Sequence, residues 1–258
     1  MPHTIAEQHM NAQAPRFLPS GDTALCVEFA DRIDRAVSAR VLALADRIEA
    51  AQVAGIVELV PTFRSLMIHY DPDVLCNAEL KSALAPLVIG LDSTERPGRR
   101  WVIPACYDAR LAPDLDDVAG RTGLSPQEVI ARHSAVTYHV YMLGFLPGFP
   151  YMGDLPAELA LPRRENPRTK VPSGSIAIAT TMAAIYALES PGGWHLIGRT
   201  PVPVWDLRRD PPALLRAGDK LVFNPVSFEE YEDLLERARS GILRMEPEDV
   251  LAPAGASA

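Results

Sequence analysis

The first 107 residues combine short apolar runs that suit strands with two apolar stripes that repeat at helical spacing. Turn residues at positions 19–22 precede the first alternating run. We expect strands over residues 23–29, 55–60, 65–70 and 101–107, and helices over residues 33–48 and 77–87. This order is typical of a split βαβ pattern, in which two helices cover one face of an antiparallel sheet.

In the second half of the chain the apolar runs are short, and turn residues separate them at nearly regular spacing. This pattern predicts a compact β-barrel or β-sandwich. The expected strands lie in VTYHVYML, SIAIAT, AAIYAL, HLIG, VPVWDL and KLVFNPV. Two short helices precede them, and the second starts at a capping box of Ser125 and Glu128 with Pro126 at the first helical position. A last helix is expected over residues 228–243.

The segment ERPGRR at residues 95–100 has the Pro, Gly and charge of a boundary between domains. We therefore expect an α+β protein with a small N-terminal domain over residues 16–96, or as far as about residue 107. Residues 97–258 then form the C-terminal β-domain with flanking helices. Loose tails are expected over residues 1–15 and 251–258.

Composition and charge narrow the class of protein. The 258 residues are 48% hydrophobic and 22% charged, as in ordinary globular proteins. A formal net charge of -8 argues against nucleic acid as the main partner, because binding a polyanion needs a basic face. No apolar run approaches the roughly 20 residues that span a bilayer, and no secretory leader is evident, so we expect a cytoplasmic protein with no membrane contact.

Several kinds of site are not expected. Cys26, Cys76 and Cys106 are odd in number and far apart, which favours free thiols over disulfides. His133 and His139 are six residues apart, which is not the helical spacing of metal ligands, so no metal site is predicted. The sequence also lacks a G-x-x-x-x-G-K-[ST] phosphate loop and a G-x-S-x-G nucleophile elbow.

The candidate chemistry is concentrated between residues 138 and 201, which hold seven of the sixteen glycines. Within this stretch Arg163, Arg164, Arg168 and Lys170 are accompanied by a single acid, Glu165. Guanidinium groups bind carboxylates and phosphates with paired hydrogen bonds, so the cluster indicates an anionic ligand. The alternative is a solvated loop whose charges face water.

The segment SPGGWHLIGRTP combines main-chain donors with titratable and cationic side chains. Amides at Gly192 and Gly193 could face an anionic oxygen, and His195 and Arg199 would share one face of the strand that follows. The alternative is a glycine turn that leads into a half-buried strand. Ser173 and Ser175 either donate to an anion or close a turn, since no base is assigned to make them nucleophiles.

Three long motifs carry a family resemblance, namely YMLGFLPGFPYMGDLP, LPRRENPRTKVPSGS and SPGGWHLIGRTP. They resemble the family that contains the B subunit of bacterial ATP-dependent 5-oxoprolinase, the Kip-type kinase inhibitor and allophanate hydrolase subunit 1, and whose module forms part of urea carboxylase. The similarity runs from GDTALCVEF through VPTFRSLMIHYDP to LLRAGDKLVFNPVS, so it covers nearly the whole chain.

The resemblance implies a small N-terminal α/β domain, a C-terminal cyclophilin-like β-barrel and a larger carboxyltransferase-like partner subunit that completes the site. It also implies which residues form that site. The implied catalytic residues are His195 and Arg199, and the implied substrate-binding residues are Gly148, Phe149, Arg163, Arg164, Arg168, Ser173, Ser175, Gly192 and Gly193.

One segment departs from the family pattern. Relatives have Gly-Gln-Thr-Gly-Ile-Tyr-Pro after a barrel strand, whereas this chain has Thr181 to Ala187, with Met182 in place of the Gln and Tyr186 retained. A thioether cannot replace the paired donor and acceptor of an amide. The departure indicates either a new specificity or a lost activity.

The resemblance implies an enzyme subunit that acts on an amide, lactam or ureido substrate, with 5-oxoproline as the leading candidate. Neither an ATP site nor a biotin attachment motif is evident, so ATP or biotin is expected to come from partner subunits. The alternatives are an inhibitor of a sensor histidine kinase, a carboxyltransferase subunit of a biotin-dependent carboxylase, or a structural subunit.

Overall fold

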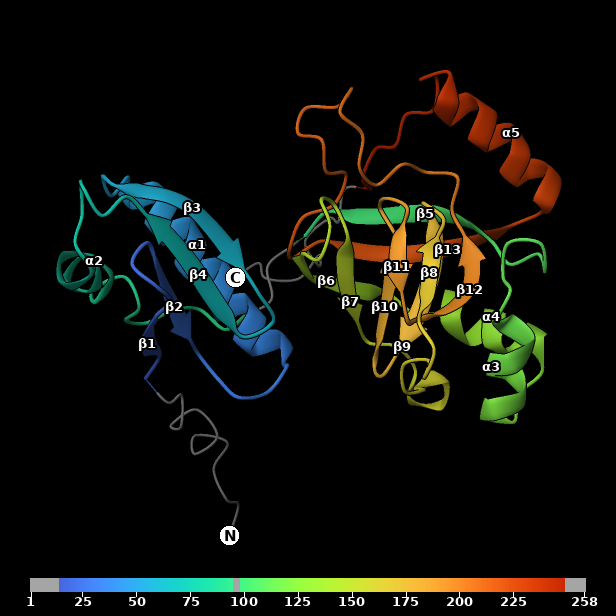
Figure 1. Cartoon of the computed structure of the whole chain (residues 1–258), viewed down its shortest axis with the longest axis horizontal. Coiled ribbons are helices and arrows are strands. Elements are labelled where there is room, and N and C mark those ends of the chain that lie inside the picture. The colour runs from blue at the N-terminus through green and yellow to red at the C-terminus, as the bar shows by residue number, and fades with distance from the viewer. Residues whose placement is uncertain (1–13, 95–97, 249–258) are drawn as a thin grey trace, which may run out of the picture. The chain divides into compact units, whose positions relative to one another are not determined.

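The computed structural model describes residues 14–94 and 98–248 (Figure 1). The chain divides into two compact units, Met1–Arg96 and Pro97–Ala258. Most of the predicted tail at residues 1–15, and all of the one at 251–258, lie outside the described residues.

The first unit contains a four-stranded antiparallel sheet whose strands hydrogen-bond in the order β1-β2-β4-β3. Its elements are β1 (Arg16–Pro19), β2 (Ala24–Glu28), α1 (Arg35–Ala51), β3 (Ile56–Pro61), β4 (Ser65–Tyr70) and α2 (Asn77–Leu84). β4 lies between β2 and β3, and α1 connects those two strands. This arrangement confirms the predicted split βαβ unit, but the fourth strand of the sheet is β1 and not the strand expected over residues 101–107.

Local sequence signals explain both a success and a miss in this unit. The Asp34 carboxylate accepts hydrogen bonds from the backbone N–H groups of Ala36 and Val37, so α1 starts at Arg35 rather than at residue 33. The edge strand β1 was not predicted, because it has four residues, three of them exposed, and ends in a proline.

The second unit is built around a closed barrel in which the strands hydrogen-bond in the order β10-β7-β6-β13-β5-β12-β9 (Figure 1). The barrel strands are β5 (Arg100–Cys106), β6 (Tyr138–Leu143), β7 (Pro150–Gly153), β9 (Ser175–Ala179), β10 (Met182–Ile185), β12 (His195–Arg199) and β13 (Lys220–Val226). A separate two-stranded ribbon pairs β8 (Arg168–Val171) with β11 (Ser190–Gly192). The structure thus decides between the barrel and the sandwich.

Three helices and one short helical turn accompany the barrel among the described residues. They are α3 (Leu115–Thr122), η2 (Ala157–Leu159), α4 (Pro126–Ser134) and α5 (Phe228–Arg239). The capping box is confirmed, because Ser125 Oγ accepts from the Glu128 N–H while the Glu128 carboxylate accepts from the Ser125 N–H.

The strand predicted at residues 101–107 belongs to the barrel and not to the first sheet. β5 pairs in parallel with β13, from Arg100 opposite Lys220 to Cys106 opposite Val226. An alternating apolar pattern identifies a strand, but it does not identify a partner that is 120 residues away in sequence.

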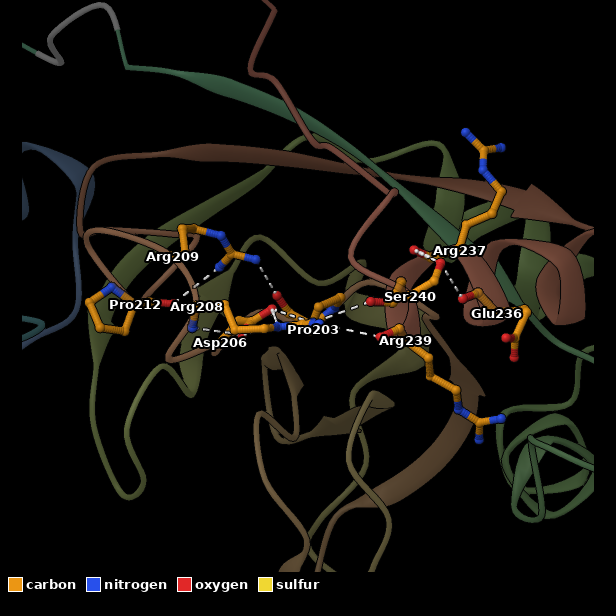
Figure 2. A network of polar contacts seen from close by, with 10 residues as sticks. Pro203, Asp206, Arg208, Arg209, Pro212, Glu236, Arg237, Arg239 and Ser240 are labelled. Atoms are coloured by element: carbon orange, nitrogen blue, oxygen red, sulfur yellow. Dashed lines mark hydrogen bonds and ion pairs between the residues drawn. The ribbon is translucent and has the colours of Figure 1, made fainter.

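The strand predicted in VPVWDL is wrong, since this segment is a loop with one isolated bridge between Trp205 and Ala213. Pro201 and Pro203 have no N–H group to contribute to a ladder. The Arg209 guanidinium organises the loop instead, donating to the Pro203 carbonyl at 2.9 Å and the Pro212 carbonyl at 3.1 Å (Figure 2).

The same loop holds the end of α5. Arg208 pairs with Asp206 at 2.8 Å and donates to the carbonyls of Ala238 and Arg239, which lie in the last turn of the helix (Figure 2). A cation at a helix C-terminus is also favourable for the helix dipole. α5 therefore ends at Arg239, four residues before the predicted end.

His133, in the last turn of α4, packs into a buried aromatic cluster with Tyr107, Tyr138 and Phe223. Its ring stacks on Phe223 at 4.7 Å, and its Nδ1 is 2.8 Å from the Tyr107 hydroxyl. The side chain is fully buried, and this burial lowers the pKa of His133 to about 3. The imidazole is therefore neutral in the folded protein at physiological pH.

We expect this histidine to make the protein sensitive to acid. In the unfolded chain His133 binds a proton below its ordinary pKa of about 6.5, whereas the folded chain does not until about pH 3. Stability is therefore lost as the pH falls through that window, by roughly 2 kcal/mol at pH 5. Urea unfolding of the wild type and of His133→Leu at pH 7 and pH 5 measures this, because the variant loses this pH dependence. Equal losses in both proteins would contradict the assignment.

Candidate functional site

A hollow of about 310 Å³ opens on the barrel unit and is lined mainly by aromatic rings. The lining residues lie in the β6–β7 turn, in β7, immediately after β10, in β11, in the β11–β12 connection and in the loop before β8. Its lining residues are Phe145, Phe149, Tyr151, Arg163, Pro167, Tyr186, Pro191, Gly192, Gly193 and Trp194.

The walls of the hollow are rings that pack edge to face. Phe149 contacts Tyr186 with ring centroids 5.2 Å apart and Trp194 at 6.3 Å, and both pairs are nearly perpendicular. Phe149 and Tyr186 are almost completely buried. Such packing fixes the shape of the hollow before any ligand enters.

Phe145 stands at the rim and is 61% exposed. It has a backbone φ of 65°, which is strained for a residue with a large side chain. Hydrogen bonds within the turn keep it there, including one from the Gly144 N–H to the Phe149 carbonyl at 3.1 Å. Strained residues of this kind concentrate at functional sites.

Arg163 is the charged residue among those that line the hollow. Its guanidinium carbon lies 5.9 Å from the centre of the Trp194 ring, within the range of a cation–π contact. Burial raises the pKa of the Tyr186 hydroxyl, which therefore stays protonated. The hollow thus offers flat apolar walls, one cation and a phenolic hydroxyl.

The predicted arginine cluster divides between two places. Arg163 reaches the hollow, whereas Arg164 and Arg168 both donate to one carboxylate oxygen of Asp114, at 2.8 and 2.6 Å. Asp114 is 3% exposed and was not recognised in the sequence. The available signal was its position immediately before α3, where an Asp usually caps a helix.

His195 lies outside the hollow, against α3. It is fully buried, its Nε2 is 2.9 Å from the Pro162 carbonyl, and its Nδ1 is 3.9 Å from an oxygen of Asp117. Because a carbonyl can only accept, Nε2 carries the proton. His195 is therefore buried against α3 and does not line the hollow.

Arg199 lies at the opposite end of β12 from Gly193, and its guanidinium faces Tyr231 of α5. Strand residues rise roughly 3.3 Å each, so His195 and Arg199 are about 13 Å apart even though they were expected on one face. The hollow therefore does not bring the Gly193 amide and the Arg199 guanidinium together.

The remaining predicted residues stabilise turns and strands. Gly148 has a φ of 71° and packs against Trp205, where a Cβ atom would have little room. The Ser173 hydroxyl donates to the Ala187 carbonyl at 2.8 Å, and Ser175 is fully buried in β9. Of the eleven predicted residues, the hollow brings together Phe149, Arg163, Gly192 and Gly193.

The described residues hold neither a candidate metal site nor a candidate membrane-spanning helix. No group of three or more His, Cys, Asp or Glu side chains is placed to hold a metal ion within residues 14–94 and 98–248. Over the same residues no helix has the length and apolar character to cross a bilayer.

Comparisons with known proteins agree with this fold. Residues 15–215 match the family model of the carboxyltransferase domain, subdomains C and D. The chain is 36% identical over 232 residues to the B subunit of 5-oxoprolinase from Bacillus subtilis, covering 84% of this chain and 95% of that protein.

Two solved structures extend the comparison. The TTHA0988 structure superposes with a TM-score of 0.72 and 37% identity, covering 79% of this chain and 40% of that one. The chain therefore spans about two fifths of TTHA0988. The K. lactis urea amidolyase superposes with a TM-score of 0.76 at 24% identity, over 91% of this chain and 16% of that one, which shows a shared fold.

Proposed function

Because the chain belongs to the family of the carboxyltransferase domain, subdomains C and D, we propose that it is the smaller subunit of an ATP-dependent complex of the 5-oxoprolinase type. A relative that matches most of its length is the B subunit of a 5-oxoprolinase. Such a subunit works with partner subunits, and we assign the partner here to a larger carboxyltransferase-like chain.

The hollow carries the proposal, because its groups suit a small cyclic amide that bears a carboxylate. 5-Oxoproline has a flat five-membered lactam ring, which can lie against Phe149 and Trp194. Its carboxylate can pair with Arg163, and the Tyr186 hydroxyl can donate to the lactam oxygen. A volume of about 310 Å³ is at the lower end of the range for small-molecule sites, which suits so small a molecule.

The lining groups bind and orient rather than react. Opening a lactam at its carbonyl carbon requires activation of that oxygen and transfer of a proton to the leaving nitrogen. We assign those steps, and the ATP that drives them, to the partner subunits, so the chain alone is inactive. In a carboxyltransferase complex the partner would supply biotin instead.

Reconstitution tests the proposal. The full chain is combined with the larger subunit, and ATP hydrolysis and 5-oxoproline consumption are measured for each alone and for the mixture. We expect coupled turnover in the mixture only. Turnover by this chain alone would contradict the assignment of the reactive groups, and a tight complex with a sensor histidine kinase but no turnover with the larger subunit would favour an inhibitor.

A further inference from the structure

Asp114 is a heavily bonded acid near the hollow, although it lines no part of it. One carboxylate oxygen accepts from the Arg164 and Arg168 guanidinium groups, and the other accepts from the Leu196 N–H at 2.7 Å. The Asp114 N–H in turn donates to the Leu196 carbonyl at 3.0 Å. The residue therefore joins the loop before β8 to strand β12.

This arrangement is not explained by the start of α3. Asp114 occupies the N-cap position of that helix, where an Asp side chain ordinarily accepts from the first backbone N–H groups. Its side chain makes no such bond, and its backbone has a φ of -111° and a ψ of 3°. The carboxylate turns to the two arginines instead, so a stabilising local contact has been given up for a long-range one.

The loop from Leu161 to Arg168 is tied down on both sides of Arg163. The Leu161 carbonyl accepts from the Thr180 N–H at 2.6 Å, and the Arg164 N–H donates to the Gly193 carbonyl at 2.8 Å. The Arg164 side chain then reaches Asp114. With its neighbour fixed in this way, Arg163 has its side chain directed to the Trp194 ring.

Removing the Asp114 charge would leave two partly buried guanidinium groups facing one another. The two guanidinium groups are close together because both bond to the same Asp114 oxygen. Without the carboxylate they would repel each other, and the repulsion between two like charges is several times stronger in a buried setting than in water. The loop would relieve the repulsion by moving away from β12, and Arg163 would move with it.

We propose that Asp114 is the positioning residue of the hollow, which holds Arg163 over Trp194 by anchoring Arg164 and Arg168 to β12. The hollow's role as a substrate site rests on the proposed function, but the anchoring itself does not. The anchoring and the substrate site can be tested separately, because the protection of the loop's amides from hydrogen exchange is measured without substrate.

Asp219 provides a matched control for a general loss of stability. It is equally buried, at 1% exposure, and it accepts from the Arg99 guanidinium and the Trp101 indole N–H elsewhere in the same barrel unit. Asp114→Asn and Asp219→Asn each remove one buried charge that pairs with arginine. Only the Asp114 charge bonds to the loop before β8, so only Asp114→Asn should release that loop.

Hydrogen exchange of the full-length chain measures the anchoring. In Asp114→Asn we expect amides in residues 161–168 and 193–196 to exchange at least about tenfold faster, since a lost charged hydrogen bond is worth that factor or more. Asp219→Asn should leave those peptides unchanged and speed exchange near Trp101. Equal acceleration of the loop in both variants, or none in Asp114→Asn, would overturn the proposal.

A rescue separates anchoring from folding. In Asp114→Asn with Arg168→Gln one of the two opposed cations is gone, so loop protection should return part of the way toward the wild-type value. If Asp114→Asn does not fold, Arg168→Gln alone keeps one anchor and should speed exchange in the loop relative to the wild type, by less than the roughly tenfold expected when both anchors are lost. No recovery, or no change in that single variant, would contradict the anchor.

In the reconstituted complex, steady-state kinetics of the same variants should show different effects on KM and on kcat. Loss of a positioning residue should raise KM for 5-oxoproline by about tenfold with a smaller change in kcat. Faster exchange in the loop with unchanged KM would support the anchor and count against the hollow as the substrate site.

Discussion

Gly192→Ala is expected to lower the turnover of the reconstituted complex by about a hundredfold, because misplacing a binding group by about 1 Å has an effect of that order. A methyl group at this position would overlap the Tyr186 hydroxyl and its ring. Tyr186 is 1% exposed and packs against Phe149, so its ring could yield to the methyl group only by moving into the hollow that it lines. Overfilling such a site also costs about 1–3 kcal/mol of stability.

The adjacent Gly193 provides the control. A methyl group there would meet its nearest neighbour, Pro167, at 3.6 Å, which is ordinary van der Waals contact. Gly193→Ala should therefore change thermal stability and turnover far less than Gly192→Ala. Equal effects of the two substitutions would mean that the overlap with Tyr186 is not the cause of the loss.

Arg163→Gln is expected to raise KM for 5-oxoproline by about 10- to 100-fold, since a hydrogen bond to a charged group contributes about 1.5–3 kcal/mol. The glutamine keeps a donor and part of the length of the side chain but removes the charge. kcat should change less, because the guanidinium is assigned to the carboxylate of the substrate rather than to its lactam oxygen. Steady-state kinetics at fixed ATP measure both constants.

Lys170→Gln is the matched control, because it removes a cation from the same basic segment. The Lys170 side chain is 70% exposed and pairs with Glu189 at 3.1 Å, away from the hollow. A surface pair of this kind contributes little. A rise in KM as large in Lys170→Gln as in Arg163→Gln would show that the general positive charge of the segment matters, rather than Arg163 itself.

The sequence patterns identified strands and helices more reliably than their neighbours. Alternation located β5 and β13, but pairing between residues 100–106 and 220–226 depends on closing the barrel, which no local pattern records. The capping box at Ser125 fixed the start of α4, because that signal is entirely local.

The site was predicted in part for a similar reason. Gly192, Gly193 and Arg163 were recognised through the concentration of glycines and arginines in one stretch, and the hollow does contain these three, although it does not contain Gly148. Side-chain alternation placed His195 and Arg199 on one face, but it carries no information about what packs there. α3 covers one residue and α5 the other.

The role of Asp114 could not be predicted from the sequence. Its position is that of an ordinary helix cap 50 residues before Arg164, and only the folded chain reveals that its carboxylate is used across that separation. The split of the arginine cluster follows from the same contact. One arginine faces the hollow, while the two on Asp114 hold the loop that carries it.

The decisive experiment is a structure of the reconstituted complex with 5-oxoproline bound. We expect the ligand in the aromatic hollow, with its carboxylate within hydrogen-bonding distance of Arg163 and its ring against Trp194. A ligand held wholly by the larger subunit, with the hollow covered and empty, would refute the assignment of the hollow as the substrate site.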